Sequence, residues 1–467
     1  MKLFFVDIIR FFASILLSLG IISAPSVNFT PMENRIYTDG EIKVTPDPTK
    51  YVKAVACNEG FDIYNPPESG DFGYRYGPSV LVNADGSIDA YLSAPGVNDE
   101  WDWIMYRHSP DGGKSWTDEK AVLMPTPDSK DFYSCCDPGV VKFGEYYYLA
   151  YTSTVDEGGV DNNVFVARSK TPDGPLEKWN GNGWGGKPEP IVEYNGDPTT
   201  YGAGEPSMVV LGDTLYVYYT WRDGGINETR LSTADAENEN WPLTMVEHGT
   251  AISYDAGSTD SADVAFIEDF GKFIAVNTVD RFTEESSVGI YISDDGYTFE
   301  KSYCLKTNVS HCCHNAGISS RPNGHIRLTD KIYVAYAYGD NWGRWPTRLQ
   351  QIELSLTDAP DFSDSSSNNL KTPVVTDKSG WYVNYTCITT ETRVYDCSVS
   401  DDSFDVKVYK IDTERNFKRI YKDVTFVNYD ESIISVSGTH ITPVSSGQTY
   451  VTAEWNGFSV EFLIKVN

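Results

Sequence analysis

The clearest pattern along the chain is a short apolar run, a glycine-acid pair and then a second, tyrosine-rich run. It occurs over 135–152 as CCDPGVVKFGEYYYLAYT and returns over 204–220 as GEPSMVVLGDTLYVYYT. Val, Tyr and Thr favour strands, and a glycine-acid pair between two such runs favours a hairpin turn. Each stretch therefore predicts two antiparallel strands joined at Gly144-Glu145 or at Gly212-Asp213.

Looser copies of this pattern bring the number of repeats to five. Their leading residues are 77, 137, 205, 263 and 315, at spacings of 52 to 68 residues. A third strand-like segment follows in each repeat, over 103–109, 164–169, 229–233, 288–293 and 348–354. Repeats of this length that hold several short strands are typical of propeller blades. The prediction is an all-β chain in which residues 52–358 form a five-bladed β-propeller with three strands in each blade.

The N-terminal end follows a different pattern. Met1-Lys2 precedes an apolar run over about 11–22 and small residues over 23–26, which together indicate a secretory signal peptide over 1–25. Asp7 and Arg10 interrupt the run, so a membrane anchor is the alternative. No later segment reaches the roughly 18 apolar residues that a membrane span needs. We expect a secreted, extracellular protein with no membrane span after signal removal. Residues 27–55 are a polar lead-in, and 57–75 are expected to be loop.

The C-terminal end predicts a second unit. Residues 359–370 are rich in Pro, Asp, Ser and Asn and form a linker by composition, and 371–467 form a separate all-β unit. Apolar and polar positions alternate over 433–466, as in a small β-sandwich. This end resembles the bacterial immunoglobulin-like (group 2) domain, and the resemblance implies an Ig-like β-sandwich.

Composition narrows the classes of partner. A net charge of −30 excludes nucleic acid, because few cations are present to neutralise phosphates. The 31 Tyr and 11 Trp residues favour either a sugar-binding cleft or a β-rich core filled with tyrosine. We expect a carbohydrate substrate and a monomer.

Eight cysteines in a secreted chain predict disulfides. Cys387 and Cys397 flank a predicted hairpin and are expected to pair with each other. The adjacent pairs Cys135-Cys136 and Cys312-Cys313 are expected to be oxidised, either within each pair or between blades. Adjacent cysteines lack the spacing of structural zinc sites.

Residues 109–116 match the Asp-box motif, S-x-D-x-G-x-x-W, and 293–299 hold a contracted copy. In this motif the Asp and Gly form a turn and the Trp packs beneath it. The motif therefore predicts a structural hairpin and not a catalytic site.

The leading residues of different blades converge at one mouth of a propeller, so Asp137, Glu205 and Asp263 should share a pocket. Close carboxylates in a pocket raise the pKa of at least one of them. A protonated acid beside an ionised partner is what glycoside hydrolysis requires. The alternative for each residue is structural, a side chain that caps a strand by accepting backbone N–H groups.

The motifs Cys136-Asp137-Pro138-Gly139 and Gly204-Glu205-Pro206-Ser207, with their tyrosine-rich return strands, resemble five-bladed glycoside hydrolases of family 43. The resemblance covers about 60–358 and implies an enzyme acting on arabinan, xylan or fructan. We expect a secreted glycoside hydrolase that cleaves an arabinan-, xylan- or galactan-type glycan with inversion. The resemblance also implies that Asp137 orients the substrate and tunes the acid's pKa, and that Glu205 is the general acid. Blade one departs from the family, because Gly77 stands where the family has its basic Asp. Asp71, Asp62 and then Asp263 are the candidates for the missing base.

Further candidates surround the predicted mouth. The residues expected to contact substrate are Arg75, Trp101, Trp103, His314, Asn315 and Trp342. Packing is an equal alternative for the tryptophans. No cofactor is expected to be required. The family resemblance allows a structural calcium ion whose water His314 would hold, and a hydrogen-bonded core histidine is the favoured interpretation.

Two other functional classes stay open. Tyr74-Arg75-Tyr76-Gly77-Pro78 and the Asp-box resemble sialidases, in which three arginines hold a carboxylate, and Arg75, Arg281 and Arg321 would be the three here. The second class is a non-catalytic, sugar-binding or adhesive propeller, which Gly77 and the Ig-like unit favour.

Overall fold

Both stretches with the clearest apolar pattern form the hairpins they predict. β6 (Cys136–Phe143) pairs antiparallel with β7 (Tyr146–Ser153), across a two-residue turn. β10 (Gly202–Leu211) and β11 (Thr214–Asp223) repeat the arrangement. The turn glycines Gly144 and Gly212 have φ of 55° and 65°, a left-handed conformation that glycine adopts without strain.

The computed structural model describes residues 44–66, 73–254, 261–339, 343–362, 385–412 and 416–467. The predicted signal peptide, Asp71, Trp342 and most of the predicted linker lie outside these ranges. Within the described ranges, no helix has the length and apolarity that crossing a membrane requires.

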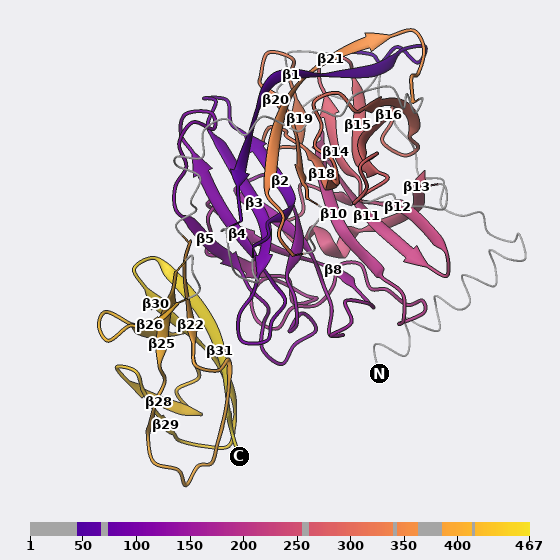
Figure 1. Ribbon diagram of the computed structural model, residues 1–467. Helices are drawn as coiled ribbons and strands as arrows, with labels where there is room; N and C mark the ends of the chain where they lie inside the picture. The colour runs from indigo at the N-terminus through magenta and orange to yellow at the C-terminus, as the bar shows by residue number, and fades with distance from the viewer. Residues whose placement is uncertain (1–43, 67–72, 255–260, 340–342, 363–384, 413–415) are drawn as a thin grey trace, which may run out of the picture.

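Five sheets in the described part of the chain form the blades of a propeller (Figure 1). Blade one holds β2 (Tyr76–Val82), β3 (Ile88–Pro95), β4 (Asp102–Ser109) and β5 (Glu119–Leu123), and blade two holds β6, β7, β8 (Asn163–Ser169) and β9 (Glu177–Lys178). Blade three holds β10, β11, β12 (Ile226–Asp235) and β13 (Val246–Ser253), preceded by the 3-10 helix η2 (Trp241–Thr244). Blade four holds β14 (Asp263–Ile267), β15 (Lys272–Val279), β16 (Ser287–Ser293), β17 (Glu300–Leu305) and the short β19 (His325–Ile326). Blade five holds β18 (His314–Ile318), β20 (Ile332–Ala337), β21 (Thr347–Thr357) and β1 (Tyr51–Tyr64).

The inner strands close into a ring. β2 neighbours β6, β6 neighbours β10, β10 neighbours β14, β14 neighbours β18, and β18 neighbours β2 again. A buried apolar cluster fills each interface between neighbouring blades, as with Leu81 and Leu149 between blades one and two. The predicted all-β fold with a five-bladed propeller is confirmed by this ring.

The predicted loop over 57–75 is wrong in its first half. Residues 51–64 form β1, which pairs antiparallel with β21 and becomes the outer strand of blade five (Figure 1, indigo beside orange). The pairing shifts register between Ala56 and Gly60, and this irregularity interrupts the alternation that would have indicated a strand. In the described residues, blades one, two, three and five each have four strands rather than the predicted three, and blade four has five with the short β19. The first strand of the described chain, β1, completes the last blade.

A segment after β18 spans the far ends of the inner strands. The carbonyl of Ser320 accepts the N–H of Val82 in blade one at 2.7 Å. Pro322, Asn323 and Gly324 then accept N–H groups of blades two, three and four in turn, at 2.5, 3.1 and 2.9 Å. We call residues 320–326 the plug. Its His325 is fully buried, with Nδ1 2.8 Å from Glu268 Oε1 and Nε2 2.6 Å from the carbonyl of Val210.

The Asp-box forms the turn that its sequence predicts. Asp111 Oδ1 accepts the N–H groups of Lys114 and Ser115 at 3.1 and 2.8 Å, and Trp116 Nε1 donates to the carbonyl of Gly113. In the contracted copy, Asp295 Oδ1 accepts the N–H of Tyr297 at 2.8 Å. Both turns follow a third strand, so their role is to join strands within a blade.

The C-terminal unit is a second all-β body (Figure 1, orange to yellow, with β22 and β31). Its sheets are formed by β22 (Tyr385–Thr390), β25 (Val408–Ile411) and β26 (Phe417–Arg419); by β23 (Val394–Cys397), β31 (Phe458–Val466), β30 (Gly447–Trp455) and β27 (Thr425–Val427); and by β24 (Phe404–Asp405), β29 (His440–Pro443) and β28 (Ile434–Ser437). One buried core joins them, and β22 pairs in parallel with β5 of blade one. The Ig-like assignment stays a prediction.

The cysteines named below do not form the predicted disulfides. Cys135, Cys136 and Cys397 are thiols in this structure. Cys397 Sγ lies 3.5 Å from the carbonyl of Lys465, so the predicted Cys387–Cys397 disulfide is not formed. Cys136 Sγ lies 3.7 Å from the carbonyl of Thr152, and no bond joins it to Cys135.

Candidate active site

The leading residues of all five blades line one cavity at the near end of the inner strands, which we call the mouth. Its volume is about 30 Å³. The lining residues are Gly77, Pro78, Asp137, Pro138, Glu205, Pro206, Ser261, Ala262, Asp263, Asn315, Ala316 and Gly317. Space of this size holds about two water molecules, so the narrow part of the mouth is a water-sized chamber between carboxylates.

Four of the five leading positions share an unusual backbone conformation. Gly77, Asp137, Glu205 and Asn315 have φ of 56°, 49°, 50° and 48°. Each lies where the pairing of the inner strand with its neighbour shifts register, which is the geometry of a β-bulge. Asp and Asn tolerate the left-handed region better than most residues, whereas Glu has no such tolerance. Glu205 is therefore held in a strained conformation, of a kind that gathers at functional sites.

Hydroxyl groups of the preceding blade hold these strained residues in place. Ser93 Oγ in blade one accepts the N–H of Asp137 at 2.8 Å. Thr152 Oγ1 in blade two accepts the N–H of Glu205 at 2.6 Å. Asn315 Nδ2 then donates to Glu205 Oε1 at 3.3 Å across the mouth. Glu205 is thus positioned by blades two and five at once.

Asp263 joins three blades. Its Oδ1 accepts from Ser207 Oγ of blade three at 2.6 Å, and its Oδ2 accepts from the N–H of Ile318 in blade five at 2.8 Å. Burial raises the pKa of Asp263 to about 6, and these donors act in the opposite direction. Asp263 therefore lines the mouth as predicted, with both carboxylate oxygens engaged by neighbouring blades.

Gly77 leaves a vacancy that Asp137 approaches. A Cβ atom on Gly77 would lie 3.1 Å from Asp137 Oδ1 and 3.4 Å from Ser93 Oγ. A side chain at Gly77 would therefore crowd the carboxylate of Asp137. The Asp137 carboxylate therefore lies next to the space that a side chain in place of Gly77 would occupy.

Two of the other predicted acids have different outcomes. Asp62 lies on β1, with the strands β21 and β20 between it and the inner strand of blade five. Its carboxylate is buried and binds Arg348 Nη1 at 3.2 Å and Tyr338 OH at 3.1 Å. Burial raises its pKa and Arg348 opposes the rise. This ion pair is its role here, so it is not the base at the mouth. Asp71 lies outside the described residues.

The residues predicted to contact substrate include both buried and exposed side chains. Trp103 is fully buried, so its ring is unavailable to a sugar, whereas Trp101 is 42% exposed. Arg75 is buried and bound to Glu119, at 2.9 Å through Nε. His314 is buried between Phe282 and Trp345, with Nδ1 2.8 Å from Asn315 Oδ1, and does not line the mouth.

The three arginines of a sialidase-like site are not assembled. Arg75 is engaged by Glu119, and Arg321 lies in the plug, at the opposite end of the inner strands, where Asp330 binds it at 2.7 Å. Arg281 packs over the ring of Phe282. The sialidase alternative thus lacks its carboxylate-binding cluster.

Tyr201 and Asp102 lie behind the residues that line the mouth, and the sequence pattern does not single them out. Burial, then the nearby Glu205 and Asp137, raise the pKa of Tyr201, so its phenol stays neutral beside the two acids. The carboxylate of Asp102 accepts from Tyr74 OH at 2.7 Å and from Tyr76 OH at 3.1 Å, and burial raises its pKa to about 6. Neither is the leading residue of an inner strand, because Tyr201 lies in a loop and Asp102 begins the third strand of blade one.

The calcium prediction stays a prediction. Among the described residues, no group of three or more His, Cys, Asp or Glu side chains is arranged to hold a metal ion.

No family model and no curated protein match the chain. Similar solved structures include a family 117 glycoside hydrolase from the marine bacterium Zobellia galactanivorans, at 15% identity, 65% coverage of this chain, 90% of that chain and a TM-score of 0.46. The α-L-arabinofuranosidase from Podospora anserina in complex with cellotriose is 12% identical, covering 67% of this chain and 99% of that one at a TM-score of 0.46. The endo-arabinase from Bacteroides thetaiotaomicron is 16% identical, covering 64% and 98% at a TM-score of 0.40.

Proposed function

We propose that the chain is a secreted glycoside hydrolase that cleaves a polysaccharide of the arabinan, xylan or galactan type with inversion, at the mouth of the propeller. The observation that carries the proposal is Glu205, an acid held at φ 50° where Gly77 occupies the equivalent position of blade one. Glycine would fit this conformation without strain, so a glutamate there is retained at a cost. A catalytic acid explains that cost.

Glu205 is the general acid in this proposal. It stands at the mouth with Asn315 on one carboxylate oxygen, which fixes the direction of the group. Protonated Glu205 donates its proton to the glycosidic oxygen as the bond to the leaving sugar breaks. Asn315, a predicted substrate contact, acts here as a positioning residue for the acid.

Asp137 takes the place of the missing base. Its carboxylate borders the vacancy over Gly77, and the adjoining chamber has room for a water molecule. Asp137 would accept a proton from that water as it attacks the anomeric carbon from the face opposite the leaving group. Asp263 is the second candidate, although Ser207 and Ile318 already engage both of its oxygens.

A substrate screen and an azide rescue test this assignment together. The purified protein is assayed on arabinan, xylan and galactan with a reducing-sugar readout, and the anomeric form of the first product is read by NMR. Asp137→Asn should abolish turnover of an activated glycosyl fluoride, and azide should restore it with formation of a glycosyl azide. Asp263→Asn is the matched variant and should gain nothing from azide.

Three outcomes would overturn parts of the proposal. Azide rescue in Asp263→Asn alone would move the base to blade four. Retention of the anomeric configuration would replace the water by an enzyme carboxylate as nucleophile. No turnover of any glycan, with glycan binding intact, would make the chain a non-catalytic sugar-binding propeller.

A further inference from the structure

The loop over 96–101 joins β3 to β4 on the mouth side of blade one and is tightly closed. The N–H of Gly96 donates to the carbonyl of Trp101 at 2.7 Å, and Asn98 and Asp99 have φ of 59° and 66°. A Cβ on Gly96 would lie 2.5 Å from the carbonyl oxygen of Glu100. The loop therefore has one compact shape, and its tip presents Asn98 and Glu100 on one side and Trp101 on the other.

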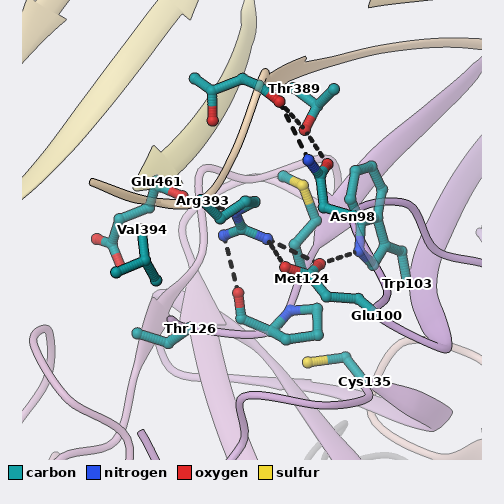
Figure 2. Close-up of polar contacts among 12 residues, drawn as sticks. Asn98, Glu100, Trp103, Met124, Thr126, Cys135, Thr389, Arg393, Val394 and Glu461 are labelled. Carbon is teal, nitrogen blue, oxygen red and sulfur yellow. Dashed lines mark hydrogen bonds and ion pairs between the residues drawn. The ribbon is translucent and has the colours of Figure 1, made fainter. Parts of the chain in front are cut away.

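The C-terminal unit binds the side of this loop that carries Asn98 and Glu100 (Figure 2). Arg393 Nη1 lies 2.7 and 2.8 Å from the two carboxylate oxygens of Glu100, and Nη2 donates to the carbonyl of Pro125 at 2.8 Å. Arg393 Nε donates to the carbonyl of Glu461 at 2.8 Å, so the same guanidinium ties the C-terminal unit to two segments of blade one. Arg393 is only 5% exposed.

A second set of contacts fixes the loop at Asn98. Asn98 Nδ2 donates to the carbonyl of Thr390 at 3.2 Å, and Asn98 Oδ1 accepts from Thr389 Oγ1 at 2.7 Å (Figure 2). Glu100 Oε2 also accepts from Trp103 Nε1, at 2.5 Å, inside the blade. All three nitrogens of the Arg393 guanidinium donate hydrogen bonds, and one of them binds a buried carboxylate. Such a contact makes a rigid junction between the C-terminal unit and blade one and not a flexible tether.

The other side of the loop carries an exposed aromatic surface, which we call the platform. Trp101 and Tyr133 have ring centroids 5.2 Å apart, and Tyr133 and Phe132 have centroids 6.1 Å apart. Trp101 is 42% exposed and Phe132 is 40% exposed. Exposed rings grouped in this way offer flat apolar faces on which the C–H face of a sugar ring packs.

Backbone contacts place the platform next to the mouth. The N–H of Trp101 donates to the carbonyl of Tyr133 at 2.9 Å, and the N–H of Cys135 donates to the carbonyl of Asp102 at 2.9 Å. Tyr133 lies four residues before Asp137 along the chain. The platform is thus the rim of the mouth between blades one and two.

Acidic side chains border the platform and define the charge of a fitting ligand. Asp99 lies in the same loop as Trp101, and Asp156 and Glu157 just precede Gly159, where a Cβ would lie 2.7 Å from Trp101 Cζ3. Burial first, then the carboxylates of Glu157, Asp99 and Asp156, raise the pKa of Tyr133. Carboxylates accept hydrogen bonds from sugar hydroxyls and repel uronates. The net charge of −30 on the whole chain also disfavours binding of a negatively charged glycan.

We infer that the C-terminal unit is a fixed part of the substrate-binding rim, where Arg393, through Glu100, positions Trp101 so that the platform binds a neutral glycan chain extending from the mouth. Arg393 is a positioning residue here, because it touches the loop and not the glycan. That the bound glycan is then cleaved rests on the proposed function, but its binding to the platform does not.

Calorimetry on the full chain carrying Glu205→Gln tests the platform without turnover. The probes are linear xylohexaose and arabinohexaose, and hexagalacturonate is the charged counterpart. Trp101→Ala should weaken binding of whichever neutral hexasaccharide binds by about tenfold, the value of one well-stacked ring. Tyr421→Ala is the matched control, since Tyr421 is 79% exposed in the C-terminal unit and its removal should leave the affinity unchanged.

Arg393→Lys tests the positioning role. Lys keeps a positive charge beside Glu100 but loses the fork that reaches Pro125 and Glu461, so the loop should loosen and affinity for the hexasaccharide should fall about threefold. In the active chain, KM for the polysaccharide should rise more than kcat falls. A purely structural defect would instead lower the active fraction and leave KM unchanged.

The outcomes separate the two proposals. Hydrolysis of a glycan together with unchanged affinity in Trp101→Ala would overturn this inference alone. Neutral glycan binding that needs Trp101, without hydrolysis, would support it and overturn the proposed function. Hexagalacturonate binding as tightly as the neutral probes would overturn the choice of a neutral ligand, and an Arg393→Lys chain with unchanged KM and affinity would overturn the role of the C-terminal unit.

Discussion

The two ends of the inner strands, the mouth and the plug, differ in backbone conformation and in hydrogen bonding. At the mouth, four leading residues adopt left-handed φ, the strand pairing shifts register, and acids from three blades line the cavity. At the far end, the plug adds backbone hydrogen bonds to four blades and buries His325 beside Glu268. Backbone strain is concentrated at the mouth, whereas the plug end joins the blades by backbone-to-backbone hydrogen bonds.

This contrast separates function from stability within a single blade. A strained acid weakens the fold and is worth keeping only where chemistry needs it. A plug that satisfies the backbone groups of neighbouring blades strengthens the fold and contributes nothing to chemistry. Changes at the mouth should therefore alter activity more than stability, and changes at the plug should do the reverse.

The largest expected effect is on catalysis at the mouth. Glu205→Gln keeps the shape and the contact with Asn315 but removes the proton, so kcat on a polysaccharide should fall by roughly two to four powers of ten. Activated aryl glycosides should lose less. Asp330→Asn removes a carboxylate at the plug end and should leave kcat unchanged. Equal losses in both variants would erase the contrast between the two ends.

The next effect is on stability at the plug. Gly324 has φ of 85°, and a Cβ there would lie 3.0 Å from Val209 Cα. Gly324→Ala should lower the free energy of unfolding by about 3–4 kcal/mol, the sum of left-handed strain and overpacking. Gly86 has φ of 84° with no atom within 4 Å, so Gly86→Ala isolates the strain and should cost about 1 kcal/mol. Similar urea midpoints for the two variants would show that the plug is loosely packed.

A third test uses the pH dependence of stability. Asp263 has its pKa raised from 3.8 to about 6, so the folded chain keeps this proton between these values while the unfolded chain loses it. The free energy of unfolding should therefore fall by about 3 kcal/mol as pH rises through this window. Asp263→Asn should remove that part of the slope.

Asp102 and Glu100, with pKa values raised to about 6 and about 7, add slopes of the same sign. The measurement is therefore the difference between the parent and Asp263→Asn urea titrations at each pH. Parallel profiles would contradict the burial of an ionisable Asp263 at the mouth.

The smallest expected effect concerns the strain at the mouth. Glu205→Gly should raise the free energy of unfolding by about 1 kcal/mol while abolishing activity, because glycine adopts φ near 50° freely. Asn315→Gly should gain less, since Asn tolerates this region. Thermal scans of both variants check the order. A loss of stability in Glu205→Gly would mean that the contacts of Glu205 outweigh its strain.

The features that repeat in the chain are those that could be predicted from it. Asp137, Glu205, Asp263 and Asn315 share a position relative to a strand and a turn, and a ring of strands brings equivalent positions together. The loss of an acid at Gly77 was visible for the same reason. Its consequence, the approach of Asp137 to the vacancy, depends on side-chain positions that the pattern does not encode.

Features that depend on the pairing of distant segments cannot be predicted from local sequence patterns. β1 is interrupted by a register shift and pairs with a strand about 300 residues later, so local alternation gave no signal. The sequence presents Asp62 as a loop acid, because the interrupted strand that carries it has no local signature. Arg393 and Glu100 are ordinary charges in sequence, and only their burial against each other makes them a junction.

The pairing of β1 with β21 also determines how long β1 stays without its partner strand while the chain is synthesised. Tyr51 faces Thr357, so the strand made first waits for its partner while roughly 300 further residues are added, about 15–60 s at typical elongation rates. During that interval the buried side of β1, with Val52 and Ala54, has no blade to cover it, and the ring has an open seam. The nascent chain therefore carries an unpaired edge for most of its production, and this edge is where assistance by a chaperone, or misassembly with another nascent chain, would begin.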